Sequence, residues 1–353
     1  MIRNTLLDIA YAGVLAPSAD NEHVFRIELA ESGIVLWPTA EFASNTEGLR
    51  RVLGLISLGA VVENMRLRAE QLGFAAQINW FGAGDNRPIV ALDLSPSHAL
   101  DVDELAAAIP SRHTNRRMYS GPGLTVEETR LLTAAVGSVE GAQIIWLRGN
   151  ARRRALKLIW HAESERFLRH DLHQDLFSSI RFDLTWHETA DWALSPGGLE
   201  IDKPTRPLFK ALRHWALMRP LTWFGVHWLV GLRAGWLPAW QAPALGLLVT
   251  SFPTECGSIA AGVALERLWL RATLLDLAMQ PMAASAVLMQ PSNAEHGASS
   301  ELRSTLELGW QTIAPGLTPQ MVFRMGHAAQ PTVRSKRRPI NDYLRSSTHE
   351  TGI

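Results

Sequence analysis

Two arginine-rich segments hold the residue types best suited to binding an anion. The first spans residues 111–117 (Ser-Arg-His-Thr-Asn-Arg-Arg) and follows Pro110 directly. Arg112 and Arg116 stand four residues apart around the hydroxyl of Thr114, so both guanidinium groups could bind one phosphate. The second segment spans residues 334–338 (Arg-Ser-Lys-Arg-Arg) near the carboxyl end. A solvated basic turn is the alternative interpretation of each segment taken alone.

The composition favours a discrete anion over a polyanion. The 353 residues include 34 Lys and Arg against 34 Asp and Glu, so the formal charge is zero. Such a chain has no overall field to concentrate nucleic acid, which argues against a nucleic-acid partner. The proportions of hydrophobic (47%) and charged (19%) residues are typical of a globular protein. The single cysteine, Cys256, excludes an internal disulfide, and with an amino terminus unlike a signal peptide it predicts a cytoplasmic protein.

A third candidate segment is the turn at residues 16–23 (Ala-Pro-Ser-Ala-Asp-Asn-Glu-His). Small residues and an Asn at the end of a helix can hydrogen-bond a flat heterocycle through backbone and amide groups. The same residue types are also ordinary turn formers, so the turn alone does not establish a binding site.

The elements that must position these segments fall into two units. In the first, the pattern of apolar residues predicts helices at 4–15 and 47–72, strands at 25–29, 34–37, 77–81 and 89–92, and a short helix from Val102 to Pro110. The second unit begins with a capping box, Thr125 followed by Glu128, on a helix that Gly137 closes. Its other predicted elements are strands at 143–147, 247–252 and 321–325, helices at 151–170, 259–277 and near 300–309, and an extended tail from Ala328.

The two long helices carry an internal repeat. Gly59, Glu63, Leu67, Arg68, Ala69 and Leu72 recur at the same spacing as Gly262, Glu266, Leu270, Arg271, Ala272 and Leu275. Both helices are apolar on most faces, so both are predicted to be buried at the centre of the molecule. The repeat predicts a duplicated α+β unit with a pseudo-twofold axis, although two helices of similar composition would also match in part by chance.

A tryptophan-rich stretch without acidic residues separates the predicted helix at 151–170 from the next strand. Five of the 13 Trp lie between Arg206 and Leu245, and residues 234–254 carry no charge. Three interpretations stay open. Pro238, Pro243 and Pro253 argue against a membrane-spanning helix. A basic, Trp-rich helical pair at 206–240 could instead make a peripheral membrane contact, or the stretch could be an apolar lid on its own domain.

Other groupings of reactive residues point to ordinary structure. His161, Glu163, Glu165, His170 and their neighbours crowd one segment, but they lack the spacing of a metal site and are interpreted as a solvated helix face. No Gly-rich dinucleotide fingerprint or P-loop pattern is present, so a nicotinamide donor would bind transiently. Cys256 is interpreted as structural.

Taken in order, these segments resemble a known family. The order is helix, Pro-Ser-x-x-Asn and strand, then Arg-x-Thr-x-Arg-Arg-x-Tyr, Gly-x-Ala-Leu-Glu-Arg in the second long helix, and Arg-Arg-Pro near the end. It resembles the FMN-dependent nitroreductase superfamily, and most closely its single-chain, twin-domain Acg-like members. The resemblance implies an α+β nitroreductase-like fold with central long helices and antiparallel-rich sheets. It also implies pseudo-symmetric half-units at 1–100 and 101–353, the second with a Trp-rich helical insert at about 195–243.

The resemblance also implies a binding site for FMN. The residues that match the family's FMN contacts are Arg112, His113, Thr114 and Arg116, then Arg337 with Arg338 beside it, then Pro17, Ser18, Ala19 and Asn21, and finally Pro281, Met282 and Ala283 in a loop after the second long helix. No catalytic side chain follows from the sequence, and the candidates nearest the flavin by the resemblance are His23 and Asn21. Only Arg3 stands where a second, symmetry-related arginine cluster would be needed, so one FMN per chain is expected.

The implied function is electron transfer by bound FMN. In one direction, a transiently bound NADPH or NADH would donate electrons, and the substrate would be a flat or hydrophobic nitro compound, quinone or enone. In the other direction, a flat or hydrophobic substrate would be dehydrogenated and oxygen would accept the electrons. The chain would be a monomer with an internal pseudo-dimer. Two alternatives stay open: an FMN storage protein without turnover, and a membrane-surface partner protein with a vestigial flavin site. Two segments depart from the family pattern. Residues 21–25 (Asn-Glu-His-Val-Phe) replace the family's Asn-x-Gln-Pro-Trp, and residues 281–284 (Pro-Met-Ala-Ala) lack its acidic residue and glycine. The resemblance therefore does not define the residues that face the substrate.

Overall fold

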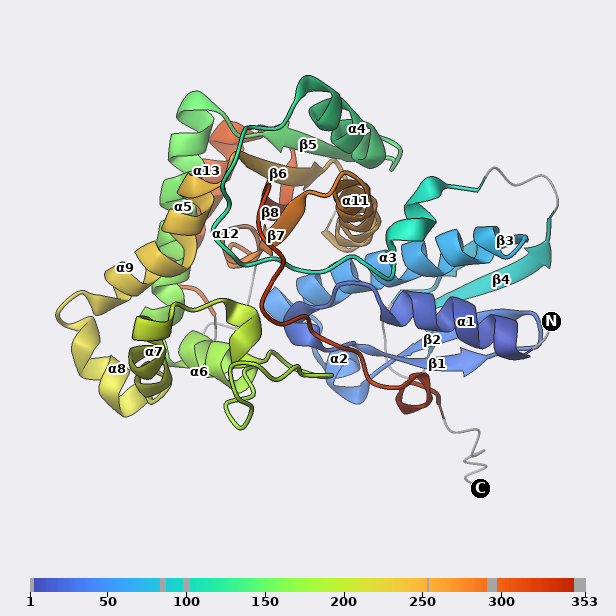
Figure 1. Ribbon diagram of the computed structural model, residues 1–353, viewed down its shortest axis with the longest axis horizontal. Helices are drawn as coiled ribbons and strands as arrows, with labels where there is room; N and C mark the ends of the chain where they lie inside the picture. Colours follow the sequence, from blue (N-terminus) through green and yellow to red (C-terminus); the bar gives the residue numbers. More distant parts are fainter. Residues whose placement is uncertain (1–2, 83–86, 98–101, 253, 291–296, 346–353) are drawn as a thin grey trace.

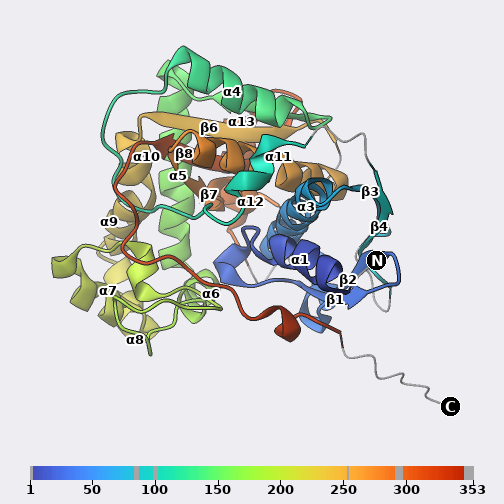
Figure 2. The ribbon, with the colours of Figure 1, turned by 45° about the vertical axis from the view of Figure 1, so that its right-hand side comes forward.

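The computed structural model describes residues 3–82, 87–97, 102–252, 254–290 and 297–345. These residues form two four-stranded antiparallel sheets and a larger number of helices (Figure 1). The α+β class expected from the sequence is confirmed. Figures 1 and 2 show the two sheets on opposite sides of a central pair of long helices.

All strands of the first sheet come from the first hundred residues. The sheet has the order β1-β2-β4-β3, with β1 at Phe25–Leu29, β2 at Gly33–Pro38, β3 at Phe74–Trp80 and β4 at Val90–Pro96. Ile27 pairs with Leu36 in register. Along β1, Phe25 and Ile27 are buried whereas Arg26 and Glu28 are exposed, so one face of this edge strand meets the core and the other meets water.

The second sheet has the matching order β5-β6-β8-β7. Its strands are β5 at Ala142–Trp146, β6 at Ala244–Thr250, β7 at Ala278–Met282 and β8 at Thr318–Gly326. Every residue of β6 is buried, because helices cover both of its faces. Leu248 packs in the cluster around one long helix, whereas Leu247 and Val249 pack in the cluster on the opposite face.

The two long helices cross at a pair of glycines. Helix α3 spans Gly48–Gln71 and helix α11 spans Thr254–Leu274. A Cβ added to Gly59 would lie 2.2 Å from the carbonyl oxygen of Ile259, and one added to Gly262 would lie 2.0 Å from that of Ile56. The backbones therefore approach more closely than any larger residue allows, and the contact is reciprocal.

The remaining helices cover the sheets or build the insert. They are α1 (Arg3–Val14), α2 (Ala40–Ser44), α4 (Val126–Gly137), α5 (Gly149–Leu168), α6 (His170–Ser178), α7 (Arg206–Leu212), α8 (Trp215–Thr222), α9 (Val226–Gly231), α10 (Leu237–Gln241), α12 (Ala284–Val287) and α13 (Ser300–Ile313). A one-turn π-helix at Leu232–Trp236 joins α9 to α10. The expected capping box of Thr125 and Glu128 begins α4.

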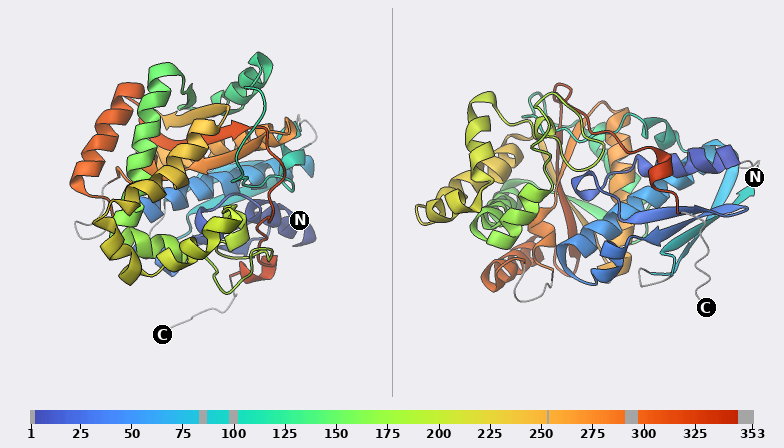
Figure 3. Two further views of the ribbon diagram at one scale, coloured as in Figure 1. Left: turned by 60° about the vertical axis from the view of Figure 1, so that its left-hand side comes forward. Right: turned by 90° about the horizontal axis from the view of Figure 1, so that it is seen from below.

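The Trp-rich stretch folds into short helices rather than into one long one. Helices α7 to α9 lie together at one end of the molecule, away from the first sheet (Figures 1 and 3), whereas α10 lies beside β6 of the second sheet (Figure 2). Within the described part of the chain, no helix is long and apolar enough to cross a membrane.

Two expectations about the end of the second long helix were wrong. That helix ends at Leu274 instead of residue 277, and Asp276, with φ at 54°, reverses the chain. Pro281 and Met282 then lie in strand β7, where a loop was expected. The strand was missed because it is short and contains Pro, which a sheet tolerates on an edge strand such as β7.

The extended tail links the two sheets. After β8 it passes Lys336, whose N–H donates to the carbonyl of Ala190. It then reaches the first sheet, where Leu344 forms a parallel bridge with Ile27 and Tyr343 is buried in the first core. Figure 1 shows this tail running across the front of the molecule from the second sheet to the first. Segments from both ends of the chain are therefore brought side by side.

Candidate functional site

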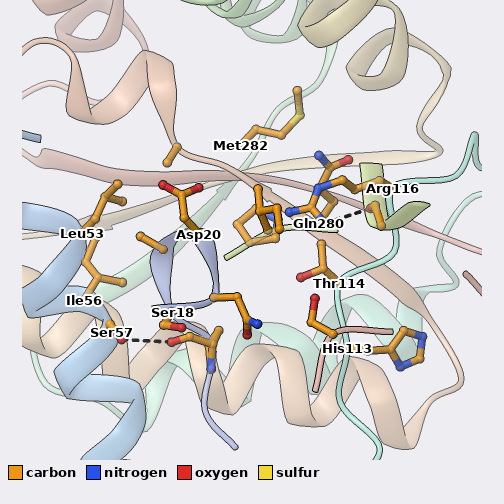
Figure 4. Close-up of a pocket in the computed structure, with 18 of the residues that line it drawn as sticks. Ser18, Asp20, Leu53, Ile56, Ser57, His113, Thr114, Arg116, Gln280 and Met282 are labelled. Carbon is orange, nitrogen blue, oxygen red and sulfur yellow. Dashed lines mark hydrogen bonds between the residues drawn. The ribbon is translucent and has the colours of Figure 1, made fainter. Parts of the chain in front are cut away.

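A cavity of about 620 Å³ lies where segments from both parts of the chain meet. This volume is in the range of small-molecule and cofactor sites. Its walls come from residues 15–21, helix α3, residues 109–116, helices α5 and α6, strand β7 and residues 333–337 of the tail. Figure 4 shows that α3 contributes Leu53, Ile56 and Ser57 to one side, and that Thr114 and Arg116 stand on the other.

The structure brings most of the candidate residues into this one cavity. The lining includes Pro17, Ser18, Ala19, Asn21, Arg112, His113, Thr114, Arg116, Pro281, Met282, Ala283 and Arg337. Arg338 is not in the lining, and its guanidinium carbon lies 5.6 Å from the ring centre of Trp192. His23 is also absent from the lining.

The turn at residues 17–21 is strained and firmly held. Asp20 and Asn21 both have a left-handed backbone, with φ of 52° and 64°, a conformation that costs energy in residues other than glycine. The hydroxyl of Ser57 donates to the carbonyl of Pro17 at 3.2 Å. The hydroxyl of Ser18 is buried and has no hydrogen-bond partner among the described residues. A ligand in the cavity could therefore supply a partner that the protein lacks.

Arg337 clamps this turn to the tail. Its guanidinium donates to the carbonyls of Val14 at 2.9 Å and Ala16 at 2.7 Å, and also to the side-chain oxygen of Asn21. Burial, with Arg112 nearby, lowers the pKa of Arg337 to about 10. Because these protein groups already occupy most of its donors, Arg337 acts mainly to position the turn.

Arg112 is likewise held by the protein, although its Nε has no hydrogen-bond partner among the described residues. Its side chain is 5% exposed, donates to the carbonyl of Leu15 at 2.7 Å and lies 3.3 Å from the carboxylate of Glu266. The guanidinium carbon lies 4.7 Å from the ring centre of Trp269. Glu266, on α11, is fully buried, and burial raises its pKa to about 7. Arg112 therefore joins the cavity wall to a long helix.

Arg116 has fewer protein partners in the cavity than Arg112 or Arg337. Its guanidinium donates to the carbonyl of Gly198 at 3.2 Å, and none of the salt bridges formed by the described residues involves it. Burial lowers the pKa of Arg116, but an arginine remains charged at neutral pH. Thr114 lies beside it in Figure 4, whereas the His113 ring points away and its Nδ1 donates to the carbonyl of Ser111, 2.8 Å away. Arg116 with Thr114 is thus the best-placed pair for an anionic group.

His23 lies behind the turn, in the core of the first unit. Its Nε2 is 2.8 Å from the carbonyl oxygen of Val14, and its ring centre is 5.1 Å from that of Phe25 and 5.6 Å from that of Tyr343. Burial and the charge of Arg337 lower its pKa to about 3. The imidazole is therefore neutral at physiological pH and packed among aromatic rings.

Several lining residues were not among the sequence candidates. Asp20 enters the cavity opposite Arg116 (Figure 4), and burial raises its pKa despite the nearby Arg166. Arg166 on α5 pairs with Glu163 at 3.1 Å and also lines the cavity. From the sequence, Glu163 was expected on a solvated helix face. The signal missed in the sequence is the spacing of Glu163 and Arg166, an acid and a base three residues apart on a helix whose apolar face is already buried.

That segment is also less solvated than its composition suggested. Glu165 is buried and accepts a hydrogen bond from the N–H of Ser299 at 2.9 Å. His173 is buried, with its Nε2 2.8 Å from the carbonyl oxygen of Leu212. In the described residues, no group of three His, Cys, Asp or Glu side chains is arranged to hold a metal ion.

The rest of the lining is apolar or amide. Leu53, Ile56 and Leu265 come from the two long helices, whereas Gln280 and Met282 come from β7. A cavity with an apolar wall, one well-placed arginine and a strained, hydrogen-bonding turn can bind a flat ring system that carries an anionic group.

Comparisons with known proteins give a distant structural likeness. No model of a protein family matches the sequence, and no curated protein matches it. Among solved structures, the chain is similar to the FMN-dependent nitroreductase NfnB from Mycobacterium smegmatis in complex with NADPH, with 16% identity over 70% of this chain and 100% of that one and a TM-score of 0.40. It is also similar to a nitroreductase with bound FMN from Bacteroides fragilis (10% identity, 70% and 97% covered, TM-score 0.38) and to a nitroreductase-like family protein from Bacillus cereus (10%, 70% and 97%, 0.36). At these values the likeness alone does not assign a function.

Proposed function

We propose that the protein is an oxidoreductase that uses FMN. The observation that supports this most strongly is the cavity in which Arg116 and Thr114 face the strained turn at residues 17–21. These two segments are about a hundred residues apart in sequence, and both line the cavity. An anion, a flat ring and a hydrogen-bonding edge are the three features of FMN that such a cavity would need to match.

The residues present fit that group. Arg116 and Thr114 would hold the phosphate, with Arg112 positioned behind them by Glu266. The unsatisfied hydroxyl of Ser18 and the amide of Asn21 would reach the polar edge of the ring from the turn. Pro281, Met282 and Ala283 would border one side of the ring, and Leu53 and Ile56 would exclude water from it.

When bound, FMN would supply the redox chemistry, accepting electrons from a reduced nicotinamide and passing them to an acceptor. The protein would bind and orient the reactants. Asp20 enters the same cavity and has a raised pKa, so it could hold a proton close to the reacting groups. The apolar wall favours a flat or hydrophobic acceptor, such as a nitro compound, quinone or enone.

The proposal extends to the organisation of the chain. Both sheets have the same strand order, and the two long helices meet reciprocally at Gly59 and Gly262. These observations support two half-units, at 1–100 and 101–353, that together form one cofactor site, as in the twin-domain Acg-like proteins. The chain would then work as a monomer with an internal pseudo-dimer in the cytoplasm.

Replacing Arg116 tests the assignment of the phosphate site. Arg116→Ala removes a lining guanidinium whose hydrogen bond within the protein is to the carbonyl of Gly198, so we expect FMN affinity to fall by about tenfold or more, as for the loss of a charge-assisted hydrogen bond. Arg117→Ala is the matched control, because that side chain lies outside the lining, bonds to Thr332 and pairs with Glu200 at 3.6 Å. Fluorescence quenching of free FMN on titration with each protein measures the effect.

A separate assay of nicotinamide oxidation distinguishes an enzyme from a storage protein. We expect the wild-type protein with FMN to oxidise NADPH or NADH in the presence of a quinone or nitro acceptor. Bound FMN that neither nicotinamide reduces would point to storage. Equal FMN affinity of Arg116→Ala and Arg117→Ala would contradict the proposed phosphate site.

A further inference from the structure

The connection between α8 and α9 exposes large apolar side chains. Trp223 and Phe224 are 79% and 81% exposed, and Gly225, with φ at 76°, makes the turn that carries them. Leu217 on α8 and Leu229 on α9 are also exposed. We call these four residues the hairpin tip. Side chains of this size and exposure in one short segment are typical of an interaction surface.

The core of the insert does not need the hairpin tip. Helices α6 to α9 pack around a cluster of buried residues that includes Phe177, Leu212 and Met218. Met218 on α8 is fully buried there, whereas its neighbour Leu217 faces out. Loose folding of the insert is therefore not the reason why the tip residues are exposed. They lie on the outer side of a packed helical layer.

The charged residues in the segment of sequence that carries the tip have a single sign. From Lys203 to Arg233 every charged residue is basic. Lys210 and Arg219 are exposed, and neither takes part in a salt bridge among the described residues. Aromatic side chains beside unpaired basic ones complement the surface of a bilayer that contains anionic lipid, where rings enter the interface and cations meet phosphate groups.

The position of the insert fits such a role. Helices α7 to α9 form one end of the molecule, remote from the first sheet (Figures 1 and 3). The same insert reaches the cavity through Ala234, in the π-helix that follows α9. We infer that the hairpin tip docks on a membrane surface rich in anionic phospholipid. This inference does not depend on the proposed function of the cavity.

Co-sedimentation with vesicles tests the inference on the full chain. We expect binding to vesicles of phosphatidylcholine with phosphatidylglycerol, and much weaker binding to phosphatidylcholine alone or in high salt. The double variant Trp223→Ser, Phe224→Ser should reduce partitioning by about tenfold or more, because both inserting rings are lost. Arg219→Glu should reduce binding only to the anionic vesicles.

Matched controls keep a fold defect or another occupant distinguishable. Leu308→Ser removes an equally exposed apolar side chain from α13, far from the tip, and should leave binding unchanged. None of the tip residues lines the cavity, so FMN binding by the variants should equal that of the wild-type protein. Failure of the wild-type protein to bind either vesicle would overturn the inference. A second outcome would also overturn it: a wild-type protein that dimerises and binds no vesicles, and a double variant that is monomeric. The tip would then be a contact between two copies.

Discussion

At the scale of single residues, most of the arginines around the cavity are occupied by the protein itself. Arg337 donates to backbone carbonyls of residues 14 and 16, and Arg112 pairs with the buried Glu266. Each therefore holds a segment of the wall in place. Arg116 is left with one backbone partner, which is why we assign it the principal contact to an anion. The sequence pattern alone treats all these guanidinium groups as equal.

Asp20 gives a prediction about pH. Burial raises its folded-state pKa above the ordinary value of 3.8, so the folded protein favours the protonated carboxyl. The associated stability is present at low pH and is lost as the pH rises through the folded-state pKa. Asp20→Asn keeps a residue that tolerates the left-handed backbone and removes the ionisation. The variant should therefore unfold at a higher temperature than the wild-type protein at pH 8.

The gain should disappear well below pH 3.8, the ordinary pKa of the carboxyl, because the wild-type carboxyl is then protonated in both states. Asp183→Asn is the control with the opposite sign, because its hydrogen bond to Arg181 lowers the pKa of Asp183. Thermal unfolding of the three proteins at both pH values measures this. A stability difference for Asp20→Asn that does not change with pH would show that the carboxyl does not titrate as described.

At the scale of elements, periodicity predicted the helices and strands well where the chain packs regularly. The helix and paired strands at residues 3–38 and the capped helix at 126–137 lie where the sequence placed them. Strand β7 was not predicted, since its Pro281 is tolerated only through its place at the sheet edge, which depends on pairing with the distant β8. The orientations of His23 and Asp20 also depend on residues distant in sequence, such as Tyr343 beside His23. The sequence therefore could not show that His23 faces the core and Asp20 the cavity.

The crossing of the long helices can be tested by adding one methyl group. In Gly59→Ala the new Cβ would lie 2.2 Å from the carbonyl oxygen of Ile259, so the backbones must separate. We expect a loss of roughly 2–4 kcal/mol in the free energy of unfolding, as for strong overpacking of a core. Denaturant unfolding followed by circular dichroism measures it.

Gly137→Ala is the control for this substitution. Gly137 is also helical, and a Cβ there would meet nothing within 4 Å. It should be neutral or stabilising by about 0.5–1 kcal/mol, because alanine favours a helix over glycine. Equal effects of the two substitutions would contradict the close crossing of α3 and α11.

At the scale of the whole molecule, the cavity exists because distant parts of one chain are tied together. The turn at 17–21 comes from one end, residues 333–337 from the other, and residues 109–116 from the middle. The hydrogen bonds of Arg337 join the two ends. Segments from both ends and from the middle of one polypeptide thus meet around the cavity.

Binding of FMN in this cavity can be tested by measuring the binding stoichiometry. Purified protein is titrated with FMN in equilibrium dialysis, and bound flavin is measured from its visible absorption. We expect saturation at one FMN per chain, with the protein monomeric at that point. No binding, or saturation at one FMN per two chains, would contradict it.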